Sequence, residues 1–218
     1  GAGNPIPWFE PFHQKGIKCI PVVPNVKLAQ RVQTHGADAL VVEGMEAGGH
    51  DGKLTLMALL ENVLPDIEIP VIAAGGITDG RGIAASLLMG ASGVQMGTRF
   101  LLAEECSLHP KAKDAIMAAA DTDSVVTGFT TGDSVRGLKN RFSDRYLKAE
   151  YSGASPDELS SISAGTTKRG ALFGDTENGF ILAGMSLTHL TKIQSAKEIV
   201  EELVSETERR LAAAPGLI

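Results

Sequence analysis

The sequence predicts an α/β protein in which strand–helix units follow one another around a parallel sheet. Short β-branched runs alternate with longer segments of helical period over about the first hundred residues. These runs are apolar on both faces, which is typical of strands that helices cover on both sides. The four predicted strands are residues 17–23, 39–43, 71–74 and 94–96.

The segments between these strands carry signals for helix starts and stops. Asn25 and Asp79 are each placed to cap a helix that a later glycine ends. A third helix is predicted over residues 56–63, because the proline that follows cannot continue it. Ser195 and Glu198 form a capping box, which predicts a C-terminal amphipathic helix.

The strand–helix alternation breaks in the middle of the chain. Polar segments rich in glycine, serine and threonine run from about residue 105 to 178, which favours a helical insertion or lid over further regular units. The sequence therefore predicts three parts. They are strand–helix units over residues 1–104, the insertion over 105–180, and a return to the main fold with the C-terminal helix over 181–218.

Composition excludes several classes of protein. The chain has 218 residues, of which 43% are hydrophobic, and a formal net charge of -6, so a nucleic-acid partner is not expected. No run reaches the roughly 18 apolar residues of a membrane helix, which favours a cytoplasmic protein away from membranes. Cys19 and Cys106 lie outside any motif with metal-ligand spacing, so we expect neither a disulfide nor a metal site.

Two glycine-containing turns follow neighbouring predicted strands and could bind a phosphate group. The first holds Gly75 and Gly76; the second, QMGT, holds Gln95, Met96, Gly97 and Thr98. Glycine lets backbone N–H groups approach an anion, and the helix start at Asp79 would add a favourable partial charge. An ordinary tight turn is the alternative for each motif alone.

A third motif, GMEAGGH, places a histidine at the end of another predicted strand. His50 could exchange a proton near neutral pH, while Gly48 and Gly49 would let a flat ring lie against the backbone. Glu46, in the same motif, could orient the loop or a cation. For an isolated loop histidine, a plain surface role is the alternative.

Three segments together resemble the FMN-dependent enoyl-acyl-carrier-protein reductase II family, within the nitronate monooxygenase (2-nitropropane dioxygenase) superfamily. They are EGMEAGGHDGKLT, IPVIAAGGITDGRG and VQMGTRFLLAEE. The resemblance implies a (β/α)8 barrel of the TIM type that holds FMN. Relatives have further strands before GAGNP, so this sequence corresponds to the C-terminal half, with about four βα units.

The resemblance also implies roles for individual residues. His50 maps to the catalytic histidine beside the flavin. The FMN-binding positions map to the glycines and polar residues of the three motifs, namely Gly48, Gly49, Gly75, Gly76, Gln95, Met96, Gly97 and Thr98. Met185 departs from the family pattern, because many relatives carry glutamine there.

The expected activity is NADH-dependent reduction of trans-2-enoyl thioesters in fatty-acid synthesis. The substrate would be carried by acyl carrier protein or CoA, and the basic stretch 136–141 could contact that carrier or be a solvated turn. A monovalent cation and a homodimer are further expectations. Two alternatives stay open: a nitronate monooxygenase using FMN and O2, and a half barrel that is inactive alone.

Overall fold

The computed structural model describes residues 3–217 and divides into two compact units. The described part of the first unit comprises residues 3–46, 52–96 and 201–217; the second comprises residues 47–51 and 97–200. No helix among the described residues has the length and apolar character needed to cross a bilayer.

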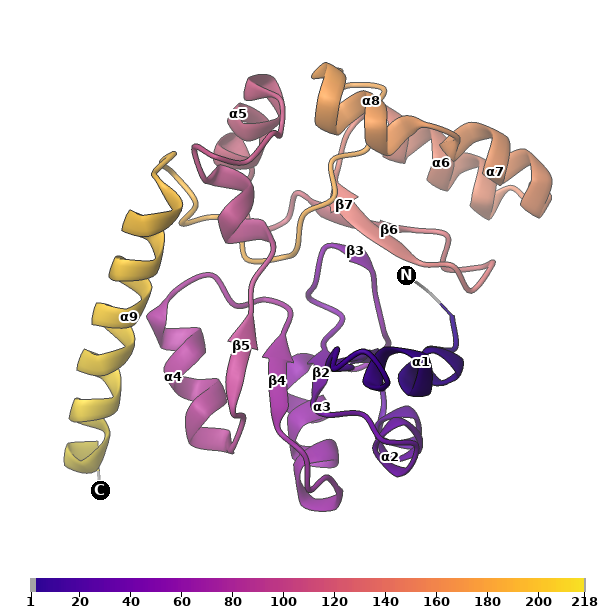
Figure 1. The fold of residues 1–218 in the computed structure, drawn as a ribbon. Coiled ribbons are helices and arrows are strands. Elements are labelled where there is room, and N and C mark those ends of the chain that lie inside the picture. The colour runs from indigo at the N-terminus through magenta and orange to yellow at the C-terminus, as the bar shows by residue number, and fades with distance from the viewer. Residues whose placement is uncertain (1–2, 218) are drawn as a thin grey trace. The chain divides into compact units, whose positions relative to one another are not determined.

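The first unit contains the predicted parallel sheet (Figure 1). Its strands follow the order β1-β2-β4-β5 and all neighbouring pairs are parallel. They are β1 (Val22–Val23), β2 (Leu40–Glu43), β4 (Val71–Ala74) and β5 (Gly93–Gln95). The sheet confirms the predicted α/β class, but the first strand is much shorter than the expected 17–23. This edge strand has a single neighbour, and Ile17 and Ile20 are about half exposed.

Helices pack on this sheet and bury its apolar side chains. Over residues 3–96, the helices of the first unit are, in chain order, η1 (Ile6–Trp8), α1 (Phe9–His13), α2 (Val26–Thr34), α3 (Leu56–Val63), η2 (Leu64–Asp66) and α4 (Gly80–Met89). Asn25 caps α2 by accepting a hydrogen bond from the Leu28 N–H at 2.9 Å, as predicted. The fully buried residues Leu40, Leu59 and Val63 lie in the core between sheet and helices.

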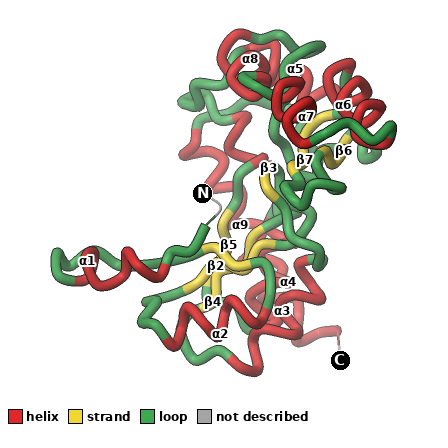
Figure 2. Tube along the Cα trace, turned by 90° about the vertical axis from the view of Figure 1, so that its right-hand side faces the viewer, coloured by secondary structure: helices red, strands yellow, loops and turns green. Residues whose placement is uncertain are grey.

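The second unit is built around an antiparallel sheet that sequence analysis did not predict. Its order is β3-β7-β6, with β3 (Gly49–His50), β6 (Ser124–Thr127) and β7 (Val135–Leu138). The short helix η3 (Thr98–Leu102) precedes the predicted insertion. The expected helices of the insertion are present: α5 (Pro110–Ala118), α6 (Arg141–Tyr151), α7 (Pro156–Ser163) and α8 (Thr166–Phe173). In Figures 1 and 2, α6 and α7 lie beside the β6–β7 hairpin.

The C-terminal helix α9 (Ala196–Ala213) is followed by η4 (Ala214–Leu217). It begins with the predicted capping box, since the Ser195 N–H donates to the Glu198 carboxylate at 2.9 Å and the Glu198 N–H donates to the Ser195 hydroxyl. Ile199 is fully buried, whereas Val200 and Val204 are about half exposed. The apolar stripe predicted for this helix is therefore only partly buried by the described residues.

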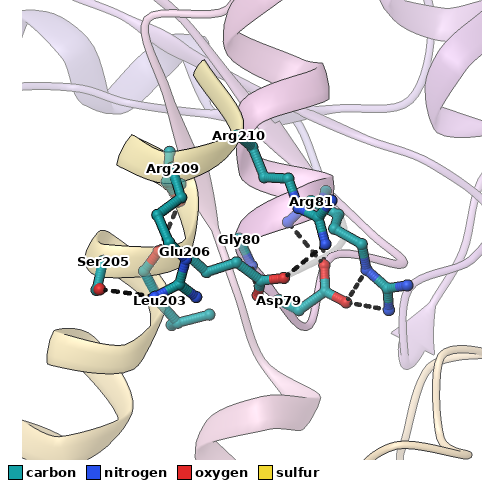
Figure 3. Close-up of polar contacts among 10 residues, drawn as sticks. Asp79, Gly80, Arg81, Leu203, Ser205, Glu206, Arg209 and Arg210 are labelled. Atoms are coloured by element: carbon teal, nitrogen blue, oxygen red, sulfur yellow. Dashed lines mark hydrogen bonds and ion pairs between the residues drawn. The ribbon is translucent and has the colours of Figure 1, made fainter. Parts of the chain in front are cut away.

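Within the first unit, α9 packs directly against the start of α4 (Figure 3). A Cβ atom on Gly80 would lie 2.6 Å from both Glu206 Cβ and the Thr207 backbone nitrogen. The Gly80 N–H also donates to Glu206 Oε2 at 2.9 Å. Glycine is needed at position 80 because two helices meet there with no room for a side chain.

We expect Gly80→Ala to lower the free energy of unfolding by about 1–3 kcal/mol, because the added methyl group forces α9 away from α4. Urea denaturation followed by circular dichroism measures this loss. Gly82→Ala, in the same helix, is the matched control, since its new Cβ would come no closer than 3.2 Å to the Ile77 side chain. Equal losses for both variants would contradict the steric explanation.

Candidate active site

The two glycines after β4 stand at the carboxyl edge of the parallel sheet. The register pairs Ala74 with Gln95, so the turn that follows β4 and the Met96 that follows β5 leave the sheet at the same edge. Gly75 and Gly76 have φ angles of 100° and 70°, in the region that side chains disfavour. Within the first unit the structure therefore brings Gly75, Gly76, Gln95 and Met96 to one edge, as the sequence predicted.

The N-terminus of α4 does not offer the free amides that its sequence suggested. Asp79 Oδ1 accepts hydrogen bonds from the Arg81 and Gly82 N–H groups at 3.0 and 3.1 Å. Glu206 accepts from the Gly80 N–H, so carboxylates of the chain itself occupy these donors. Burial raises the pKa of Asp79, but hydrogen bonds from Arg81 and Gly82 outweigh it and lower the pKa. An anion bound at this edge would instead rely on the glycine turns.

In the second unit, Gly97 and Thr98 open the helix η3. Apart from Gly97 and its chain neighbours, no heavy atom of residues 3–217 lies within 4 Å of the position that a Cβ on Gly97 would take, so the space beside this backbone is open. The Thr98 hydroxyl oxygen accepts a hydrogen bond from the Gly184 N–H at 2.9 Å. A hydroxyl can accept and donate at once, so Thr98 keeps a hydrogen to donate to a bound group.

Gly48 meets the same segment that Thr98 contacts. A Cβ on Gly48 would lie 2.6 Å from the Ala183 carbonyl carbon and 2.8 Å from the Gly184 nitrogen. Gly49 has a φ angle of 90°, which also favours glycine. The structure thus brings two predicted site residues, Gly48 and Thr98, into contact with the backbone of residues 183–184. The sequence motifs did not predict this contact. Met185 follows this backbone segment and is 41% exposed.

We expect Gly48→Ala to weaken packing of the motif against the 183–184 backbone and to destabilise the fold by about 1–3 kcal/mol. Backbone atoms cannot move aside as a flexible side chain can, so strain is not easily relieved. Thermal unfolding compared with that of Gly93→Ala measures the effect, because among the described residues only Gly93 and its chain neighbours have heavy atoms within 4 Å of the Gly93 Cβ position. Unchanged stability of Gly48→Ala would show that the loop adjusts freely.

His50 lies on β3, which is held at the edge of the antiparallel sheet. His50 pairs with Val135 of β7, and its Nε2 lies 3.2 Å from Asp133 Oδ1. Both side chains are largely exposed, at 61% and 74%. Asp133 was missed by sequence analysis because it lies far along the chain, in a polar turn before β7, and carries no motif of its own.

Beside His50, Asp51 forms a buried ion pair with Arg136 of β7. The Arg136 Nη2 and Asp51 Oδ2 atoms are 3.6 Å apart, and the two side chains are only 6% and 3% exposed. Arg136 also donates to the Ser124 hydroxyl at 3.1 Å. The sequence suggested that Arg136 belongs to a basic surface stretch. Instead, its side chain on β7 is buried. Lys139 and Arg141 of that stretch are exposed.

Glu46 has a structural partner that explains its position in the motif. Its two carboxylate oxygens accept hydrogen bonds from the Leu56 N–H at 3.0 and 2.9 Å, where α3 begins. A carboxylate at a helix start is favourable because the first N–H groups have no partner within the helix. Glu46 therefore orients the loop, one of the two roles that its sequence suggested.

Comparisons with known proteins point to one family. The sequence model described as nitronate monooxygenase matches residues 5–206. A probable nitronate monooxygenase from Staphylococcus aureus (strain JH9) is 34% identical over 210 residues, which is 91% of this chain and 58% of that protein. The chain thus spans a little over half the length of this curated relative.

Solved structures agree on the fold. FabK from Thermotoga maritima matches the whole chain with a TM-score of 0.96 and 39% identity, and 70% of FabK is covered. A nitroalkane oxidase from Streptomyces ansochromogenes matches 96% of this chain and 62% of its own, with a TM-score of 0.83 and 29% identity. The match to FabK, together with the four parallel strands, confirms the predicted barrel-type α/β fold.

Proposed function

Because this chain belongs to the nitronate monooxygenase family, we propose that it carries the flavin-binding part of an FMN-dependent oxidoreductase that reduces enoyl thioesters. The observation that carries the proposal is that the glycine turn after β4 lies at the same edge of the parallel sheet as Gln95 and Met96, through the pairing of Ala74 with Gln95. Similarity to FabK, an enoyl-acyl-carrier-protein reductase II, supports the reductase activity.

The residues at the sheet edge fit a phosphate group. Gly75 and Gly76 adopt positive φ angles that glycine takes readily, so no side chain covers this turn. In the second unit, the space beside Gly97 is open. The Thr98 hydroxyl can donate a hydrogen bond while it accepts one from Gly184. We propose that the turn after β4, with Gln95 and Met96 at the same sheet edge, binds the FMN phosphate, and we exclude the start of α4, whose amides bind Asp79 and Glu206. Gly97 and Thr98 are candidate FMN-binding residues of the second unit.

The GMEAGGH motif fits the flat part of the cofactor. The backbone of residues 183–184 fills the space beside Gly48, whereas a Cβ on Gly49 would come no closer than 4.0 Å to the Leu182 side chain, so a ring could approach the backbone at Gly49. His50 follows directly. We propose that His50 exchanges a proton with the substrate and that Asp133, 3.2 Å from its Nε2, orients the imidazole. In this scheme His50 is catalytic and Asp133 is a positioning residue.

Bound FMN, reduced by NADH, would supply the hydride chemistry. His50 would deliver a proton to the α-carbon of the enoyl thioester as the β-carbon accepts the hydride, so that the carbon–carbon double bond becomes single and the thioester bond stays intact. The exposed Lys139 and Arg141 would attract the phosphopantetheine or the acidic surface of a carrier protein.

Anaerobic flavin spectroscopy tests the activity. With the flavin-loaded protein, we expect NADH to bleach the oxidised flavin and crotonyl thioester, on CoA or on acyl carrier protein, to restore it. The two carriers compared in one assay show which is preferred, and light scattering of the same sample tests for a homodimer. Flavin that NADH does not reduce, or that enoyl thioester does not reoxidise, would rule out the reductase.

A nitronate monooxygenase is the second candidate function, favoured by the family match and by the Staphylococcus aureus relatives named as probable members. His50 would then abstract the α-proton of a nitroalkane. Reduction of the flavin by an alkyl nitronate, followed by oxygen uptake and no response to enoyl thioester, would support it. A protein that stays colourless after incubation with FMN would instead support a half barrel that is inactive alone.

A further inference from the structure

Three side chains with metal-binding groups meet in the first unit, away from the motifs described above. His13 ends α1, Cys19 lies in the segment before β1, and Asp38 precedes β2. Each offers one potential ligand atom, and these atoms all lie within 4.8 Å of one another. A nitrogen, a sulfur and an oxygen donor are therefore brought together from the end of α1 and from two connecting segments.

Asp38 is the centre of this cluster. Its Oδ2 accepts hydrogen bonds from the Cys19 N–H at 2.8 Å and lies 2.8 Å from His13 Nε2, while its Oδ1 accepts from Lys18 Nζ at 2.7 Å. The Cys19 N–H, then Lys18 and His13, hold the pKa of Asp38 well below its usual range. The Asp38 carboxylate is therefore ionised at neutral pH, as a metal ligand must be.

Cys19 sits beside this negative charge with little solvent around it. The residue is 5% exposed, and its Sγ lies 4.0 Å from the Phe9 carbonyl oxygen. Burial, and then the charge of Asp38, raise the pKa of the Cys19 thiol. A bound cation would reverse this balance, because its positive charge stabilises a thiolate and a carboxylate placed side by side.

We propose that His13, Cys19 and Asp38 form a binding site for a divalent cation of the zinc class. A thiolate and an imidazole select borderline and soft metals over magnesium or calcium, and a carboxylate completes a three-residue set to which water adds the fourth ligand. On binding, the proton of the Cys19 thiol and any proton on His13 Nε2 are released to solvent, and the Cys19 thiolate and His13 Nε2 bind the metal. The metal then replaces the His13–Asp38 hydrogen bond.

The surroundings allow a cation to reach the site. A groove of about 470 Å³ borders Cys19 and is lined in part by Phe9, Phe12 and Ile17. Lys18, whose side chain is 76% exposed, can release Asp38 and turn its ammonium group into water. A metal here would tie α1 and the segment after it to the start of β2, and so stabilise an N-terminal segment whose Trp8 is 60% exposed.

Cobalt substitution tests the site directly. The purified protein is stripped with a chelator and titrated with Co²⁺, whose thiolate-to-metal charge-transfer absorption reports a bound cysteine; Zn²⁺ is then added as competitor. We expect one equivalent of Co²⁺ to produce this absorption and Zn²⁺ to remove it. Limited proteolysis with and without Zn²⁺ should show protection of the segment that precedes β1.

Variants separate this site from adventitious binding. Cys19→Ser should abolish the charge-transfer absorption, whereas Cys106→Ser, which removes the other thiol, should keep it. His13→Gln should weaken Co²⁺ binding by at least roughly tenfold, given the size of ligand-environment effects on metal affinity. Lys18→Gln should strengthen it, because the competing ammonium is gone.

Circular dichroism checks that each variant is folded. The proposal is wrong if no absorption develops in the folded protein, if Cys19→Ser retains it, or if it depends on Cys106. It is also wrong if folded His13→Gln binds Co²⁺ as tightly as the unchanged chain. None of these outcomes bears on the flavin activity, because the three residues lie outside the proposed FMN site.

Discussion

His50→Ala should lower the turnover of the flavin-loaded protein by roughly a hundred- to ten-thousand-fold, the usual contribution of a general acid or base. We expect FMN to stay bound, because the proposed phosphate-binding residues lie in the two glycine turns and not on β3. Steady-state rates with enoyl thioester, together with flavin absorbance after gel filtration, measure both effects in one preparation.

Two variants sharpen this result. Asp133→Asn should reduce kcat with little change in KM, because it removes the charge that orients the imidazole without removing the proton donor. His35→Ala changes an exposed histidine whose ring hydrogen-bonds to the Arg31 carbonyl of the preceding helix, and it should have no effect. Turnover that survives in His50→Ala would remove His50 from the mechanism, whereas loss of flavin would assign it a binding role.

Arg136→Met should lower the free energy of unfolding by about 3–5 kcal/mol, the cost of leaving one partner of a buried ion pair without its counter-charge. Asp51 would then keep a carboxylate whose side chain is 3% exposed and whose Oδ1 already has no hydrogen-bond partner among the described residues. Chemical denaturation monitored by fluorescence or circular dichroism provides the measurement.

The double variant Asp51→Asn with Arg136→Met is the control for this prediction. It removes both charges, so most of the lost stability should return, as expected when a buried pair is replaced by uncharged groups. If the double variant is as unstable as Arg136→Met alone, the loss comes from packing of the arginine side chain and not from the unpaired charge.

Local signals in the sequence were sufficient to predict the parallel sheet and the helices that pack on it. The runs at β2 and β4 are apolar except for the final Glu43 of β2, β5 contributes Val94, and the caps at Asn25 and Asp79 depend only on residues within one turn of the helix. The glycine turns were also found, because each directly follows such a strand. These features can be predicted without knowing which distant residues pack against them.

The features that were missed depend on contacts between residues far apart in the chain. The Asp51–Arg136 pair and the closeness of His50 to Asp133 arise only when β3 pairs with β7, more than 80 residues later. Glu206 occupies the Gly80 amide across a sequence separation of 126 residues. The cluster of His13, Cys19 and Asp38 has no motif spacing, because its residues come from the end of α1 and from the segments before β1 and β2.

The positive φ angles of Gly75 and Gly76 restrict which residues this turn tolerates, even without a bound ligand. In a saturation library selected only for folded, soluble protein, glycine should still be enriched at both positions, because any side chain strains the peptide there. If glycine is enriched more strongly under selection for flavin fluorescence than under selection for solubility, the difference measures how much flavin binding restricts these two positions.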